Sequence, residues 1–247
     1  MTRKALITGG SKGLGRVIAT FLAHAGYEVI ITGRGADTLA ATARELGATA
    51  VRGDVSDARH RATLVDVVGD GLDVLVNNAS ELGPSPMPSL VTYELDAMRN
   101  VFNTNVVAPV ALVQSLRQVL AARSGLVVNI TSDAAVGAYE GWGGYGASKA
   151  ALELISRTLA AELAADGISV VAVDPGDMRT GMHQAAFPGE DISDRPLPDV
   201  TIPFWAWLFA ADHGTINGRR FGAQDPSWEI DDGRRVNAAR SGIEVAS

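Results

Sequence analysis

Short runs of consecutive apolar residues alternate with longer amphipathic segments along most of this chain. The apolar runs lie at residues 5–7, 29–31, 74–76, 126–130 and 168–173. Strands buried on both faces have this composition, whereas the segments between them carry apolar residues at helical spacing, as at Leu152, Ile155 and Leu159. The alternation predicts an α/β fold with a Rossmann-type, doubly wound parallel sheet and helices on both faces.

No linker rich in Ser, Gly or Pro divides these elements, which predicts one domain over residues 1–247. The longest apolar run, residues 202–211, has about half of the roughly 20 residues that cross a bilayer. Its aromatic part, residues 204–209, is typical of a buried helix or an oligomer contact. The N-terminus lacks the apolar stretch of a secretory signal, so we expect a soluble, cytoplasmic protein without a membrane partner.

The charge and the cysteine content exclude several classes of function. The chain has 21 Lys and Arg against 28 Asp and Glu, a formal net charge of −7, which argues against a nucleic-acid partner. It has no cysteine, and this excludes disulfides, thiolate nucleophiles and Cys-based zinc sites. Its four histidines are scattered without metal-ligand spacing, so we expect no metal site.

The first predicted strand leads directly into a glycine-rich turn with the sequence TGGSKGLG, residues 8–15, and a helical apolar pattern follows. Glycines let the backbone approach a pyrophosphate, whose charge is stabilised by the free N–H groups of a helix N-terminus. The spacing G-x-x-x-G-x-G differs from the G-x-G-x-x-G of many dinucleotide folds. A plain strand-to-helix turn is the alternative interpretation.

The second predicted strand ends without an acid, at Gly33-Arg34. A carboxylate at this point commonly binds the ribose 2′-OH of NAD, whereas an Arg suits the 2′-phosphate of NADP. Lys12, inside the glycine turn, supplies a second cation. Each of the two cations could also be ordinary solvated surface, but together they favour NADP(H) over NAD(H).

Tyr145 and Lys149 are four residues apart at the start of the strongest helical pattern, so both side chains lie on one helix face. A phenol with a pKa near 10 is a poor acid or base at neutral pH, and an adjacent ammonium lowers that pKa. Ser132 follows a predicted strand at its carboxyl end, where ligands of this architecture bind, and its hydroxyl could orient a carbonyl oxygen.

With these residues, the chain resembles the short-chain dehydrogenase/reductase family, in particular its NADP-dependent 3-oxoacyl reductase-like members. The matching motifs occur in order along almost the whole chain: the turn at residues 8–15, Asp54-Val55, Asn77-Asn78-Ala79, Asn105, Ser132, Tyr145 with Lys149, Asp174-Pro175-Gly176 and Thr180. Several ordered motifs are far more specific than any one of them. The resemblance also implies a homodimer or homotetramer.

The resemblance assigns roles to residues of this chain. It implies that Tyr145 is the general acid or base, that Lys149 lowers the pKa of Tyr145, and that Ser132 polarises the substrate carbonyl. It implies that Asn105 supports a proton relay to Lys149 through water. The residues that it assigns to the cofactor are Gly9, Ser11, Lys12, Gly13, Leu14, Gly15, Arg34, Asp54, Val55, Asn78, Ala79, Tyr145, Lys149, Pro175, Gly176 and Thr180.

The chain departs from the family pattern in three places. Ser80 replaces a glycine that usually follows Asn-Asn-Ala, and residues 217–223 replace the usual C-terminal ending, which leaves the final strand and the subunit contacts open. The glycine-rich segment 139–146 contains Trp142, which could form an apolar wall or belong to a merely flexible loop.

We interpret residues 181–199 as a substrate lid that contributes Met182 and Phe187, with a solvated insertion as the alternative. The sequence therefore predicts an oxidoreductase that transfers a hydride between NADP(H) and a small carbonyl or secondary-alcohol substrate. Two alternatives stay open at this point. They are a non-catalytic dinucleotide-binding sensor or partner protein, and a dehydratase or epimerase on the same scaffold.

Overall fold

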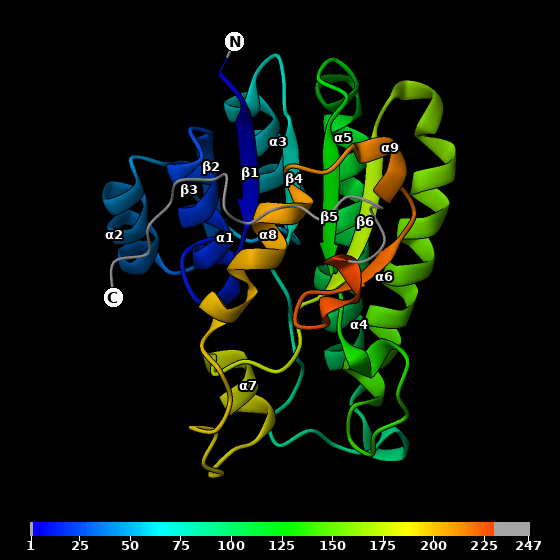
Figure 1. Ribbon diagram of the computed structural model, residues 1–247. Coiled ribbons are helices and arrows are strands. Elements are labelled where there is room, and N and C mark those ends of the chain that lie inside the picture. The colour runs from blue at the N-terminus through cyan, green and yellow to red at the C-terminus, as the bar shows by residue number, and fades with distance from the viewer. Residues whose placement is uncertain (1, 230–247) are drawn as a thin grey trace.

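The computed structural model describes residues 2–229, and a sheet of seven strands lies at its centre (Figure 1). The strands are β1 (Lys4–Thr8), β2 (Glu28–Gly33), β3 (Thr49–Arg52), β4 (Val74–Asn77), β5 (Leu126–Ile130), β6 (Ser169–Asp174) and β7 (Arg220–Gly222). All neighbours pair in parallel, in the order β3-β2-β1-β4-β5-β6-β7. The predicted α/β fold with a parallel sheet is confirmed.

Helices cover both faces of the sheet, as the doubly wound prediction requires. The α-helices of the described residues are α1 (Gly13–His24), α2 (Ala36–Leu46), α3 (Ala58–Val68), α4 (Leu95–Phe102), α5 (Ala108–Ala121), α6 (Gly143–Glu162), α7 (Gly181–Ala186), α8 (Ile202–Leu208) and α9 (His213–Ile216). One apolar core joins α1, α2 and α8 to the sheet, and a second joins α3, α5 and α6 to its other face (Figure 1).

The apolar runs of the sequence become the central strands because both of their faces are covered. Every residue of β4 and of β5 is buried, and so are four of the five residues of β1. A strand with one solvated face would instead alternate apolar and polar residues. The five sequence-predicted strands therefore correspond to β1, β2, β4, β5 and β6.

The strand order reverses between β1 and β4. From β1 the chain continues to β2 and β3 on one side, whereas β4 and the later strands lie on the other side. A parallel sheet opens a crevice at the carboxyl ends of its strands at such a point. The candidate site lies in this crevice.

The aromatic run near the C-terminus forms α8, which lies in the core. Phe204 and Trp205 are fully buried, and the Trp205 indole N–H donates to Thr201 Oγ1 over 2.8 Å. This agrees with the interpretation of a buried helix. β7 follows despite the atypical sequence, while residues 230–247 lie outside the described part of the chain. Within that part, no helix combines the length and apolarity needed to cross a membrane.

We expect the substitution Trp205→Ala to lower the free energy of unfolding by about 3–5 kcal/mol, because it leaves a cavity and removes a buried hydrogen bond. Urea denaturation followed by circular dichroism measures this loss. Val91→Ala is the control, since Val91 is 93% exposed and its truncation should change the unfolding free energy by less than about 0.5 kcal/mol. Equal losses in the two variants would contradict the assignment of α8 to the core.

Candidate active site

The glycine turn is fixed to β4 by hydrogen bonds. Asn78 donates its side-chain amide to the carbonyl of Thr8 over 2.8 Å, and Thr8 Oγ1 accepts from the backbone N–H groups of Asn78 and Ala79. Gly9 has a φ of +65°, which favours glycine, and a Cβ there would lie only 2.8 Å from Asn78 Nδ2. The turn therefore depends on glycine both for its backbone conformation and for its close approach to β4.

Gly13, the first residue of α1, faces Thr180. Gly13 has a φ of +54°, and a Cβ added to it would lie 3.6 Å from Thr180 Cγ2. A side chain here would therefore fill space between the turn and the segment after β6. The free N–H groups of α1 begin at the same place, so the arrangement fits an anionic group such as a pyrophosphate.

One cleft of about 1200 Å³ runs along the carboxyl ends of the strands. The sequence-predicted cofactor and catalytic residues that line it are Gly9, Ser11, Lys12, Gly13, Leu14, Arg34, Asp54, Val55, Asn78, Ala79, Ser132, Tyr145, Lys149, Pro175, Gly176 and Thr180. Two others lie behind its walls. Gly15 packs against Gly9 and Asn78, and Asn105 is buried beneath the loop that follows β4.

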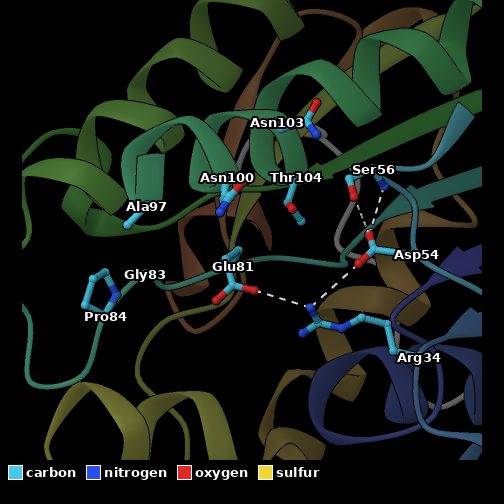
Figure 2. A pocket seen from close by; sticks show the side chains of 10 residues that line it. All are labelled: Arg34, Asp54, Ser56, Glu81, Gly83, Pro84, Ala97, Asn100, Asn103 and Thr104. Atoms are coloured by element: carbon cyan, nitrogen blue, oxygen red, sulfur yellow. Dashed lines mark hydrogen bonds and ion pairs between the residues drawn. The ribbon is translucent and has the colours of Figure 1, made fainter. Parts of the chain in front are cut away.

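Arg34 lies between two carboxylates (Figure 2). Its Nη1 is 3.5 Å from a carboxylate oxygen of Glu81 and 3.7 Å from one of Asp54. A smaller cavity of about 340 Å³ opens beside these three residues, next to α4. The sequence predicts that Arg34 binds a phosphate, but it does not indicate that the Glu81 carboxylate would compete with that phosphate for Arg34.

Tyr145 and Lys149 lie one turn apart in α6, and both are almost completely buried. Lys149 Nζ lies 5.5 Å from the centre of the Tyr145 ring and donates to the carbonyl of Ile130 over 2.8 Å. Burial lowers the pKa of Lys149 to about 7 and raises the pKa of Tyr145 to about 12. Burial thus outweighs the lowering of the Tyr145 pKa that the sequence predicts.

Hydroxyl and carboxyl groups surround the Tyr145 phenol. Hydrogen bonds with the side chains of Ser80 and Ser132 lower its pKa, whereas the charges of Asp174 and Asp133 raise it and add to the larger effect of burial. Ser132 Oγ also donates to Asp133 over 2.9 Å. The sequence assigns Ser132 to the substrate carbonyl and predicts neither of these two contacts with the phenol.

Asn105 lies in a π-helical turn, Asn103–Val107, between α4 and α5. Its side-chain oxygen accepts from the backbone N–H of Glu81 and from Ser80 Oγ, over 2.7 Å and 3.1 Å. Its amide group donates to the Glu81 carbonyl and to Ser148 Oγ, each over 2.9 Å. Asn105 therefore connects the loop after β4 to α6, and π-helical turns often occur at functional sites for such reasons.

An ion-pair network lies next to Ser132 and includes Arg220, the first residue of β7. Arg220 donates to Glu153 over 2.7 Å and to Asp174 over 3.0 Å, and it also reaches the carbonyl of Ser132. The side chains of Glu153 and Asp174 are only 10% and 14% exposed, so their charges depend on this guanidinium. The only signal in the sequence is the atypical C-terminal segment.

Aromatic side chains lie beside Tyr145. The Trp142 ring meets the Tyr145 ring edge-on at 5.9 Å, and Phe187 lies at the same distance on Trp142. Trp142 and Met182 line the cleft, and their role as a substrate wall stays a prediction. Phe187 does not line it and instead packs against His183 at 4.9 Å, so its contribution is support for the wall.

Comparisons with known proteins agree with this geometry. The family model described as short chain dehydrogenase matches residues 3–191. The rhamnolipids biosynthesis 3-oxoacyl-(acyl-carrier-protein) reductase of Pseudomonas aeruginosa is 37% identical over 218 residues, which cover 83% of each chain. The serine 3-dehydrogenase of Agrobacterium fabrum is 33% identical over 199 residues, which cover 75% of this chain and 79% of that protein.

Among solved structures, a putative short chain dehydrogenase of Shigella flexneri complexed with NADP superposes with a TM-score of 0.83. It is 30% identical, and the match covers 90% of this chain and 97% of that one. The likeness therefore extends through most of the fold described above.

We expect Arg220→Met to lower the free energy of unfolding by about 3 kcal/mol, because it leaves the buried carboxylates of Glu153 and Asp174 without their cation. Thermal and urea denaturation measure the loss. The control is Arg99→Met, which removes an exposed ion pair with Asp96 and should cost less than about 1 kcal/mol. If both variants unfold at the same urea concentration, the Arg220 network does not stabilise the fold.

Proposed function

This chain belongs to the short-chain dehydrogenase family and is an oxidoreductase, and we propose that it transfers a hydride between NADP(H) and a carbonyl or secondary-alcohol substrate. The observation that carries the proposal is the convergence of Tyr145, Lys149 and Ser132 in the cleft that the glycine turn also lines. A phenol, a buried amine and a hydroxyl are the groups needed to bind a carbonyl oxygen and deliver a proton to it.

The residues of the cleft fit NADP(H). The glycine turn and the N-terminus of α1 would hold the pyrophosphate, because the missing side chain at Gly13 leaves space between the turn and Thr180. Arg34 would bind the 2′-phosphate, Asp54 and Val55 the adenine, and Pro175, Gly176 and Thr180 the carboxamide. The bound cofactor supplies the hydride, while the protein provides orientation and charge.

In the proposed reduction, the Ser132 hydroxyl turns from Asp133 and donates to the carbonyl oxygen of the substrate. Tyr145 then gives its phenolic proton to that oxygen as the carbonyl carbon receives the hydride. In the oxidation, the phenolate takes the proton back. A charged Lys149, held close to the phenol by its bond to Ile130, stabilises the phenolate in either direction.

We also propose that residues 181–199 form a substrate lid of the one domain over residues 1–247. Two hydrogen bonds support this: Ser85 Oγ donates to the carbonyl of Ala185 over 2.6 Å, and the N–H of Arg179 donates to the carbonyl of Pro196 over 2.8 Å. The first connects α7 to the loop after β4. The apolar wall of Trp142 and Met182 suits a substrate with an apolar group beside its carbonyl.

Two further sequence-based expectations stay predictions. They are the cytoplasmic location and the homodimer or homotetramer. Sedimentation of the purified protein tests the oligomeric state directly.

The variant Tyr145→Phe should lose about 10²–10⁴-fold in kcat, because it removes the proton donor and leaves the shape of the site unchanged. NADPH consumption with a panel of carbonyl substrates measures the rate. Its control is Tyr27→Phe, because Tyr27 precedes β2 at the amino ends of the strands, away from the cleft. Wild-type turnover by Tyr145→Phe would refute the mechanism. Tight NADPH binding by the wild type with no turnover on any substrate would instead support a non-catalytic protein.

The variant Arg34→Ala should weaken NADPH binding about tenfold or more and NADH binding much less, since only NADPH carries the 2′-phosphate. Glu81→Gln should instead tighten NADPH binding, because it removes a carboxylate that competes for Arg34. Fluorescence titration of the protein with each cofactor gives the dissociation constants. Equal losses for both cofactors in Arg34→Ala would rule out the assigned role of Arg34.

A further inference from the structure

His60 is a buried histidine to which the proposed mechanism gives no role. It lies in the first turn of α3 and is 7% exposed. Its Nε2 lies 2.7 Å from Thr32 Oγ1, and Thr32 is itself fully buried in β2. Burial lowers the pKa of His60, so at neutral pH the imidazole is neutral and the contact with Thr32 is a hydrogen bond between uncharged groups.

The same imidazole packs against the turn that follows β3. A Cβ added to Gly53 would lie 2.1 Å from His60 Nδ1, far inside van der Waals contact. The backbone N–H of Gly53 donates to the carbonyl of Gly33 over 3.1 Å, so this turn begins directly beside the end of β2. The imidazole therefore lies against two strand ends, because it bonds to one and fills the space beside the other.

These two strand ends carry residues proposed for the adenosine half of NADP(H). Arg34 follows β2 and Asp54 follows Gly53, and the side chains of Arg34 and Asp54 face each other at 3.7 Å (Figure 2). The residue pairing between β2 and β3 ends at Gly33 and Arg52. Arg34 and Asp54 lie beyond it, so their positions depend on other contacts.

The helix α3 makes a second contact with the same turn. Arg61 Nη1 donates to the carbonyl of Val55, the residue after Asp54, over 2.7 Å. His60 thus packs against the first residue of the segment 53–55, and Arg61 bonds to the last. A segment that is held before the ligand arrives loses less conformational entropy when the ligand binds.

We propose that His60 is a positioning residue for the adenosine half of the cofactor. Its imidazole holds the ends of β2 and β3 in the arrangement in which Arg34 meets the 2′-phosphate and Asp54 the adenine. This inference rests on the proposed function, because it takes NADP(H) as the ligand. His60 takes no part in hydride or proton transfer, so its loss should change cofactor binding and not the rate of the loaded enzyme.

The test compares His60→Ala and His60→Gln by fluorescence titration with NADPH. His60→Ala removes the partner of the buried Thr32 hydroxyl, and the ligand must then order Arg34 and Asp54 itself, so the dissociation constant should rise about tenfold. His60→Gln provides a neutral amide that is long enough to bond to Thr32, so its dissociation constant should stay within about threefold of wild type.

A fragment of the cofactor and a kinetic measurement locate the effect. Adenosine 2′,5′-bisphosphate, titrated by calorimetry, should lose the same factor in affinity as NADPH does in His60→Ala. With NADPH as the varied substrate in turnover, KM should rise about tenfold, while kcat should stay within about twofold of wild type.

Gly53→Ala is a second variant, which keeps His60 but displaces its imidazole, because the new Cβ would occupy the space of Nδ1. It should weaken NADPH binding about as much as His60→Ala does. The double variant should bind no more weakly than His60→Ala alone, since the Cβ then has room. Losses that add in the double variant would mean that the two residues act separately, and this would overturn the inference.

Ser169→Ala is the control for a purely structural loss. Ser169 begins β6, and its Oγ donates to the carbonyl of His213 over 3.0 Å, at the amino ends of the strands and away from the cleft. This variant should lower the melting temperature and leave both dissociation constants unchanged. The same pattern in His60→Ala overturns the inference, and so does a loss in His60→Gln equal to that in His60→Ala.

Titration of the wild-type protein lets the two proposals fail separately. If the wild type binds NADPH and His60→Ala binds it equally well, the role of His60 is overturned and the proposed function stands. If the wild type does not bind NADPH at all, the proposed function itself fails, and the inference fails with it.

Discussion

The hydrogen bonds between Thr8 and Asn78 are the contact on which the rest of the site depends. β1 and β4 are the neighbours at which the strand order reverses. Their backbone pairing ends at Ile7 and Val76, so the residues that follow need other hydrogen-bond partners. Asn78 and Thr8 satisfy each other's backbone and side-chain groups there. This contact positions two walls of the cleft, because the glycine turn follows β1 and the loop with Ser80 follows β4.

The second constraint is the burial of ionisable groups in the cleft. Lys149 is 2% exposed, and its amine has a backbone carbonyl as its hydrogen-bond partner. A buried amine that titrates near neutrality and a phenol that retains its proton form a pair whose charge depends on what binds beside them. The Arg220 network instead places a permanent cation beside two buried carboxylates, and its charge opposes the rise that burial gives the pKa of Asp174.

Sequence patterns of short range predicted much of this molecule. Apolar runs gave five central strands, and the four-residue spacing placed Tyr145 and Lys149 on one helix face. Contacts between distant residues were beyond such reasoning: 67 residues separate Arg220 from Glu153, and 47 separate Arg34 from Glu81. The pKa of Tyr145 was expected to fall because Lys149 is near, but burial could be judged only from the packed structure. The sequence likewise marked Ser80 as a departure without indicating what its hydroxyl contacts.

The position of Arg220 also bears on how the protein is made. Residues leave the ribosome in order, so β1 to β6 and α6 can assemble before β7 has been synthesised. Until Arg220 arrives, Glu153 and Asp174 lack its guanidinium, and the carbonyl of Ser132 lacks the donor that Arg220 provides. Completion of the site thereby waits for the synthesis of β7, and a nascent fragment that ends before Arg220 would carry Tyr145 and Lys149 without this network.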